Sequence, residues 1–327
     1  MKRMIAGIIA TAIVGSIGAI LYINYKTTQA VDQFVLSISP FVQVEYDKVS
    51  SSVTGEVAVK GVTVTMPGFA DPMEFDAVGL KLPTFLDLLS LHDLGPLEIA
   101  RGEFPEKIAV FVDGLHLDTG DDYMMAMFRS MEAQAVEENG GTIPTRSEDP
   151  LGHCISKYGV SSRDLLELGL DRMRMSLRYQ VEQLDGEIAA DLNFEIQDAL
   201  EIDTQFTIQG RLADFATGRA DRARLIRFEV EGETQGITER TWDRCETMGV
   251  ERAIAKEAYI TSFLAGLAEG GFVADERLIE PFRVGVVAEH RHFRVIGDPP
   301  QPVDLQQVKL YSATDMPALL GVDYQTW

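Results

Sequence analysis

Alternation of apolar and polar residues is the feature that most constrains this fold. In "SVTGEVAVKGVTVTM", residues 52–66, valines occupy odd positions up to Val59 and even positions from Val62. Period two is typical of a strand with one buried face, and a slip of one residue moves every later side chain to the other face. A glycine with bulge geometry lets the chain keep its apolar side chains on one side. The stretch therefore predicts a strand in a strongly curved antiparallel sheet.

Similar segments follow along the chain, and each carries β-branched or aromatic residues at period two between turn residues. Further strands are expected at 73–85, 106–120, 172–196, 199–212, 224–233, 282–296 and 303–312. Helices are expected at 121–139, at 161–170 and at about 244–269. The fold class is therefore mainly β (α+β), with curved antiparallel sheet or sheets and a few covering helices.

A membrane segment precedes these strands. Residues 4–23, "MIAGIIATAIVGSIGAILYI", carry no charge. Twenty helical residues at about 1.5 Å each match the roughly 30 Å hydrocarbon core of a bilayer. Because Lys2 and Arg3 precede the segment, we expect a single-pass helix in the bacterial inner membrane, with a cytoplasmic N-terminus and a periplasmic body. The alternative is a signal peptide cleaved near the small residues at 28–30.

Three parts follow from this layout. Residues 1–25 form an N-terminal membrane anchor, 26–150 a first β-rich half and 151–327 a second β-rich half. "GEVAV" begins at Gly55 and "GEIAA" at Gly186, each inside a strand pair. The two halves are then weak structural repeats, or two hairpins that are similar by chance.

The chain is acidic, with 29 Lys and Arg against 51 Asp and Glu and a formal net charge of −22. Such a surface repels phosphate backbones, which argues against a nucleic-acid partner. The two cysteines, Cys154 and Cys245, suggest one disulfide in an exported chain. The alternative is two buried free thiols.

The order of segments resembles a known family. An anchor helix is followed by strands such as "YDKVSSSVTGEVAVKGVTVTM", by a late helix and by "GDPPQPVDLQQVKLYSATDMPALLGVDY". This layout is similar to that of AsmA-like bacterial envelope proteins, whose relatives include TamB-type and other repeating β-groove proteins. The resemblance implies a periplasm-facing curved sheet with an apolar concave side, associated with lipid movement or outer-membrane assembly. The chain is much shorter than the long members of that group.

Apolar strand residues are the candidate lipid-facing groups. They line a groove for acyl chains if the sheet stays open, and they form a core if it closes; periodicity does not separate the two. The candidates are Val57, Val59, Val62, Val64, Leu177, Phe194 and Ile196.

Catalytic and metal motifs are incomplete. "LHLDTG" at 115–120 presents Asp118 as an aspartic protease presents a carboxylate, but "DTQ" at 203–205 is only a partial second copy, so a turn at a strand end is the preferred interpretation. His290 and His292 alternate on one predicted strand without a third ligand at a recognisable spacing. No catalytic residue, metal or cofactor is therefore assigned.

These features predict a non-enzymatic, inner-membrane-anchored periplasmic protein whose curved apolar sheet takes part in lipid handling or envelope assembly. The expected partners are the inner membrane through residues 4–23, phospholipid or acyl chains, and an envelope protein. One alternative is a membrane-tethered interaction scaffold that binds through residues 244–269 or the 130–150 loop. The other is an envelope hydrolase.

Overall fold

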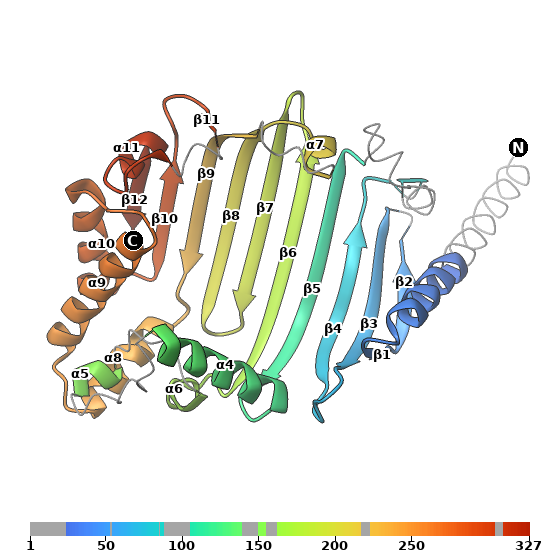
Figure 1. Cartoon of the computed structure of the whole chain (residues 1–327), viewed down its shortest axis with the longest axis horizontal. Helices are drawn as coiled ribbons and strands as arrows, with labels where there is room; N and C mark the ends of the chain where they lie inside the picture. The colour runs from blue at the N-terminus through green and yellow to red at the C-terminus, as the bar shows by residue number, and fades with distance from the viewer. Residues whose placement is uncertain are drawn as a thin grey trace, which may run out of the picture.

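The period-two segments form one large antiparallel sheet. The computed structural model describes residues 24–52, 54–84, 86–87, 105–138, 150–154, 162–216, 223–304 and 310–327. Its strands are β1 (Gln43–Glu45), β2 (Lys48–Ser51), β3 (Glu56–Thr65), β4 (Met73–Lys81), β5 (Lys107–Asp118), β6 (Arg172–Gln183), β7 (Glu187–Ile196), β8 (Leu200–Gln209), β9 (Arg224–Glu233), β10 (His292–Gly297), β11 (Val303–Asp304) and β12 (Val322–Thr326). They form a twelve-stranded sheet in the order β1-β3-β4-β5-β6-β7-β8-β9-β10-β12, with β2 beside β3 and β11 beside β9 (Figure 1).

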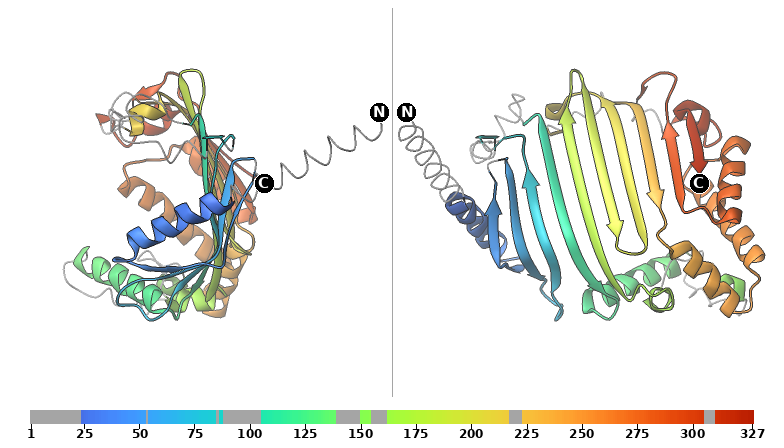
Figure 2. Two further views of the ribbon diagram at one scale, coloured as in Figure 1. Left: turned by 90° about the vertical axis from the view of Figure 1, so that its right-hand side faces the viewer. Right: turned by 180° about the vertical axis from the view of Figure 1, so that it is seen from behind.

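Helices surround this sheet at its edges. Besides the N-terminal helix at 24–38, they are α4 (Asp122–Glu138), α5 (Pro150–Cys154), α6 (Ser162–Glu167), α7 (Leu212–Ala216), α8 (Ile237–Thr247), α9 (Arg252–Glu269), α10 (Glu276–Ala288) and α11 (Met316–Leu320). The N-terminal helix and α4 project from the same side of the sheet, which Figure 2 shows edge-on. The mainly β, α+β fold class is confirmed.

The change of phase in β3 coincides with changes of phase in the neighbouring strands β4 and β5. The flanking pairs Lys60↔Ala77 and Val62↔Phe75 bring Gly61 of β3 level with Asp76 of β4. The pairs Phe75↔Leu115 and Ala77↔Asp113 likewise bring Asp76 level with Gly114 of β5. Both glycines have φ of +62°, a left-handed conformation that L side chains rarely adopt. A Cβ at Gly61 would collide with Asp47, and one at Gly114 with Asp76. Three adjacent strands therefore switch phase at the same level.

A β-bulge between β5 and β6 compensates for this change of phase, so β6 continues without one. The pairs Val112↔Leu177 and Leu115↔Met175 leave two residues of β5 opposite one of β6, which is a β-bulge. The backbone N–H of Gly114 donates to Ser176 Oγ at 3.2 Å. The apolar side chains therefore stay on one side of the sheet, as the alternation predicts.

Two helical regions differ from the sequence prediction. The segment expected as a strand at 282–296 begins inside α10, so its first part was predicted wrongly. Asp275 caps α10 by accepting a hydrogen bond from the N–H of Arg277, and β10 starts only at His292. Where one helix was expected at 244–269, there are two, with a break between Thr247 and Arg252.

Other predictions fall partly or wholly outside the described residues. The membrane helix at 4–23 lies outside them, and none of the described helices is both long and apolar enough to cross a membrane. Of the 130–150 loop, residues 130–138 belong to α4 and 139–149 are not described. Strands of both predicted halves share one sheet, because β5 pairs with β6.

Candidate functional site

One face of the sheet is apolar across its width. Registered residues of paired strands lie on the same side of a sheet, so each row can be followed from strand to strand. One row consists of Val57, Leu80, Val110, Tyr179, Leu192, Thr204, Val230, Val295 and Tyr324. The next consists of Val59, Val78, Val112, Leu177, Phe194, Ile202, Gly232, Phe293 and Thr326.

All seven candidate lipid-facing residues lie on this apolar face. Val57, Val59, Leu177 and Phe194 belong to the two rows above. Val62 and Ile196 belong to a third row, which also contains Phe75, Leu115 and Met175. Val64 follows Val62 at the next alternate position of β3 and pairs with Met73. Residues more than a hundred positions apart thus share one surface.

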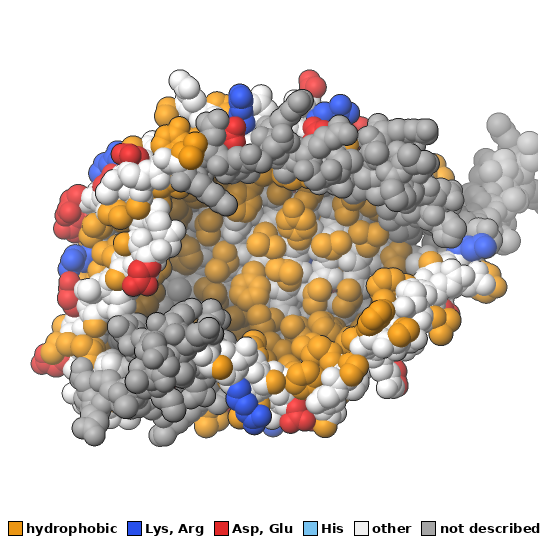
Figure 3. Space-filling model, viewed as in Figure 1, with side chains coloured by type: hydrophobic (Ala, Val, Ile, Leu, Met, Phe, Trp, Pro, Cys, Tyr) orange, Lys and Arg blue, Asp and Glu red, His pale blue; other side chains and the backbone are white. Residues whose placement is uncertain are grey.

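The middle of this face is open. Val110, Leu177 and Tyr179 are 43%, 40% and 42% exposed, although β5 and β6 are interior strands. Figure 3 shows the face as a hollow whose floor is covered with hydrophobic side chains, bordered by α4 at one end and by the N-terminal helix at one side. Partial burial raises the pKa of the Tyr179 hydroxyl.

The same face is covered at its C-terminal edge. Gly285 of α10 lies so close to β12 that a Cβ would come within 2.7 Å of Thr326 Cγ2. Phe282 stacks on Phe263 of α9, with ring centroids 4.7 Å apart, and meets Tyr324 edge-on at 5.8 Å. The aromatic cluster, defined as Trp242, Tyr259, Phe263, Phe282 and Tyr324, joins α8, α9, α10 and β12. At this edge, α9 and α10 of the same chain cover the apolar face of the sheet.

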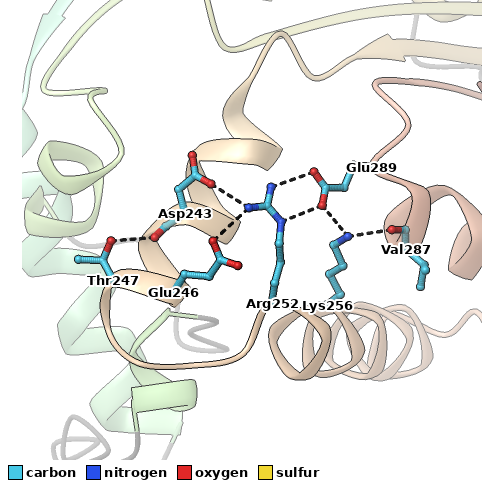
Figure 4. Close-up of polar contacts among 7 residues, drawn as sticks. All are labelled: Asp243, Glu246, Thr247, Arg252, Lys256, Val287 and Glu289. Atoms are coloured by element: carbon cyan, nitrogen blue, oxygen red, sulfur yellow. Dashed lines mark hydrogen bonds and ion pairs between the residues drawn. The ribbon is translucent and has the colours of Figure 1, made fainter.

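An ion-pair network fixes the three helices of this edge (Figure 4). Arg252 of α9 donates to both carboxylate oxygens of Glu289 at 2.8 Å and to Asp243 of α8 at 2.9 Å. The buried Lys256 lies 2.6 Å from Glu289 and donates to the Val287 carbonyl at 2.8 Å. Hydrogen bonds from Arg252 and then Lys256 lower the pKa of Glu289 to about 2, against the opposing effect of burial. The network therefore holds the C-terminal end of α10 against α9.

The predicted disulfide is confirmed. Cys154 of α5 is bonded to Cys245 of α8, with their Cα atoms 5.1 Å apart. Both side chains are buried with Trp242, Val250 and Ala255. The bond connects residues 91 positions apart and ties α5 to the C-terminal helices.

The aspartic-protease motif does not assemble in the described structure. Asp118 ends β5 and closes a turn, where its carboxylate accepts the N–H of Gly120 at 2.9 Å. Asp203 lies in β8, and β6 and β7 separate the two strands. At about 4.8 Å per strand spacing, the two carboxylates are too far apart to share a proton.

The histidines make local contacts. His290 Nδ1 lies 3.0 Å from Thr326 Oγ1, and His292 stacks on Trp327 with ring centroids 5.6 Å apart. Within the described part of the chain, no group of three or more His, Cys, Asp or Glu side chains is placed to hold a metal ion.

Comparison with known proteins adds no relative. No protein-family model matches the sequence, and no curated protein matches it.

Proposed function

We propose that this chain is a non-enzymatic, membrane-tethered envelope protein that takes up the acyl chains of lipids on its apolar sheet face. The openness of that face at Val110, Leu177 and Tyr179 carries the proposal. Soluble proteins rarely leave a large continuous apolar surface open without a ligand or partner. Transfer of an acyl chain onto it is favoured by about 25 cal/mol for each Å² of apolar area buried.

The shape of the hollow favours a lipid over a small apolar metabolite. The apolar rows continue from β3 to β12, and neighbouring strands are about 4.8 Å apart. Each acyl methylene that becomes buried contributes about 0.8 kcal/mol, so affinity grows with chain length along such a surface. A long chain, or several chains side by side, uses more of the face than a compact ligand does.

Three further features support placement in the bacterial envelope. The uncharged segment 4–23 follows Lys2 and Arg3, as in an inner-membrane anchor with its body in the periplasm. The Cys154–Cys245 disulfide suits an oxidising compartment. The order of anchor, long strands and late helix resembles the AsmA-like envelope proteins. No catalytic step is part of the proposal.

The test is lipid content and fatty-acid affinity of the full-length protein purified in mild detergent. Mass spectrometry of the organic extract should find lipid bound to the wild type. The double variant Val110→Asn and Leu177→Asn should bind a fluorescent long-chain fatty acid at least about tenfold more weakly.

The matched control is Glu195→Gln, because Glu195 neighbours Phe194 in β7 but lies on the opposite face. This variant should bind the fatty acid as the wild type does. Absence of lipid together with absence of fatty-acid binding would overturn the proposal, as would equal affinity in the double variant.

A second candidate is an interaction scaffold that uses α9. Ile254 and Phe263 of this helix are exposed, and both lie in the 244–269 segment. Photo-crosslinking from position 254 in intact cells should then give one reproducible protein adduct. Adducts to lipid alone, or none, would remove this candidate.

A further inference from the structure

A second concave surface lies on the opposite, polar face of the sheet. Its cavity has a volume of about 380 Å³. The polar side chains that line it come from six consecutive strands and are Glu56, Lys81, Asp113, Arg178, Gln180, Asp191, Asn193, Asp203 and Gln205. Register places them on the side opposite to Val110, Leu192 and Thr204. The acyl-chain proposal uses none of these side chains.

Small residues create this cavity among longer neighbours. Ala109 lies between Lys81 and Gln180 in one row, where its methyl group leaves a depression. In the next row Phe111 lies directly against Gly79, because a Cβ at Gly79 would collide with the Phe111 ring. The ring of Phe111 therefore lies beside the depression at Ala109.

The polar groups of the cavity are already oriented by bonds across the strands. Asn193 Nδ2 donates to Asp203 Oδ1 at 2.8 Å, and Gln180 Nε2 donates to Asp191 Oδ2 at 3.2 Å. Within the part of the chain that the structure describes, each amide uses one N–H in these bonds, and its other N–H and its carbonyl oxygen are left for a ligand. Arg178 is similarly held by Asp113, with Nη2 3.3 Å from Oδ1. Fixed donors and acceptors of this kind lose little freedom when a ligand binds.

The charges of the cavity restrict the chemical class of the ligand. Four carboxylates and two cationic side chains line it, which disfavours phosphates and other anions. An acyl chain here would cover carboxylate and amide groups without offering them hydrogen bonds, which disfavours it. A polyol fits better, because adjacent hydroxyl groups both donate and accept hydrogen bonds, and the C–H face of a sugar ring can pack on Phe111.

We propose that this polar-face cavity binds a neutral carbohydrate. Its volume lies near the lower end of the roughly 300 to 1,000 Å³ range of small-ligand sites, which suits one or two sugar residues. Hydrogen bonds to Asn193, Asp203, Gln180 and Asp191 orient the sugar, and contact with Phe111 buries its apolar side. Val110 and Tyr179 also border the cavity, but by register their side chains lie on the other face, so the side chains that bind the sugar are not those of the acyl-chain surface.

The experiment is calorimetric titration of the full-length protein in detergent with cellobiose, maltose and N,N′-diacetylchitobiose, and with inorganic phosphate as a non-sugar probe. At least one disaccharide should bind saturably below about 10 mM. Ala109→Phe, which fills the depression, and Asn193→Leu should each weaken that binding at least about tenfold.

The control is Gln325→Leu. Gln325 also donates its amide to a neighbouring carboxylate, Asp323, but lies on β12 outside the cavity. This variant should bind the sugar as the wild type does. Circular dichroism checks that each variant is folded, and the two cavity variants are independent tests. The inference is overturned if no disaccharide binds, if only phosphate binds, or if the folded cavity variants keep full affinity.

Discussion

The apolar face is covered at the C-terminal edge of the sheet and open at its centre. At the edge, α10 lies against β12 and the aromatic cluster fills the space between helix and sheet. At the centre, Leu177 and Val110 belong to the same face but remain about two-fifths exposed. The two regions are built from the same kinds of side chain and differ only in what lies above them.

This difference shows that apolar patterning alone does not define a hydrophobic core. The edge is stabilised by contacts within the chain, so substitutions there should reduce folding stability. Among the described residues, the side chains at the centre stay about two-fifths exposed, so substitutions there should chiefly reduce ligand binding. Each of the following measurements tests that division.

The largest effect is expected from loss of the disulfide. Replacing Cys154 and Cys245 with alanine frees a loop of 91 residues in the unfolded chain. The free energy of unfolding should fall by about 4.6 kcal/mol in the entropic model. Urea titration of the detergent-solubilised protein, followed by tryptophan fluorescence, measures it. A loss below about 1 kcal/mol would show that the C-terminal helices are held by other contacts.

Truncation within the aromatic cluster should have the next largest effect. Phe282→Ala removes ring contacts to Phe263, Tyr259 and Tyr324. Because α9 and α10 cannot close the gap fully, we expect a loss of about 3 kcal/mol in unfolding free energy. The same urea titration checks it, and fatty-acid affinity should be unchanged. Weaker fatty-acid binding with unchanged stability would reverse the assignment of the two regions.

The ion-pair network makes the stability of the edge depend on pH. The pKa of Glu289 is about 2 in the folded chain, below its ordinary value of 4.5, so its contribution is complete above pH 4.5 and disappears as pH falls toward 2. Allowing for solvent screening, we expect Glu289 to contribute about 1 to 2 kcal/mol to the free energy of unfolding. The difference in unfolding free energy between wild type and Glu289→Gln should be largest near neutral pH and shrink below pH 4.5. A difference that is constant with pH would contradict this prediction.

The smallest effect on folding is expected at the centre. In delipidated protein, Leu177→Ala should lower the free energy of unfolding by less than about 1 kcal/mol. The reason is that the side chain is 40% exposed and its removal leaves no closed cavity. With saturating fatty acid the wild type should gain more thermal stability than the variant, since ligand binding stabilises the folded state. If Leu177→Ala lowers the free energy of unfolding as much as Phe282→Ala does, the central face is covered by other parts of the chain.

The strands could be predicted because their signal is local. Alternation in β3 and β6 identified residues that share the apolar face, and the glycine within β3 marked the change of phase. Predictions failed where contacts between residues far apart in the sequence determine the secondary structure. Val284 and Val286 looked like strand residues, but the Asp275 cap and the packing of Gly285 on Thr326 select a helix.

Other features have no local signal. The pairing of β12 with β10 joins segments on either side of α11, and the prediction missed β12. Whether Val110 is covered or open depends on helices far away in the sequence. The polar-face cavity depends on which side chains flank Ala109 across two strand borders, which requires the full register.

The change of phase that β3, β4 and β5 share, at Asp47, Gly61, Asp76 and Gly114, constrains how this protein can evolve. Deleting one residue from β3 alone would reverse the facing of part of that strand relative to β4, so that its valines leave the hollow and polar residues such as Lys60 face it. A tolerated deletion would need matching deletions in β4 and β5. The first strands of the sheet should therefore keep their lengths together across descendants.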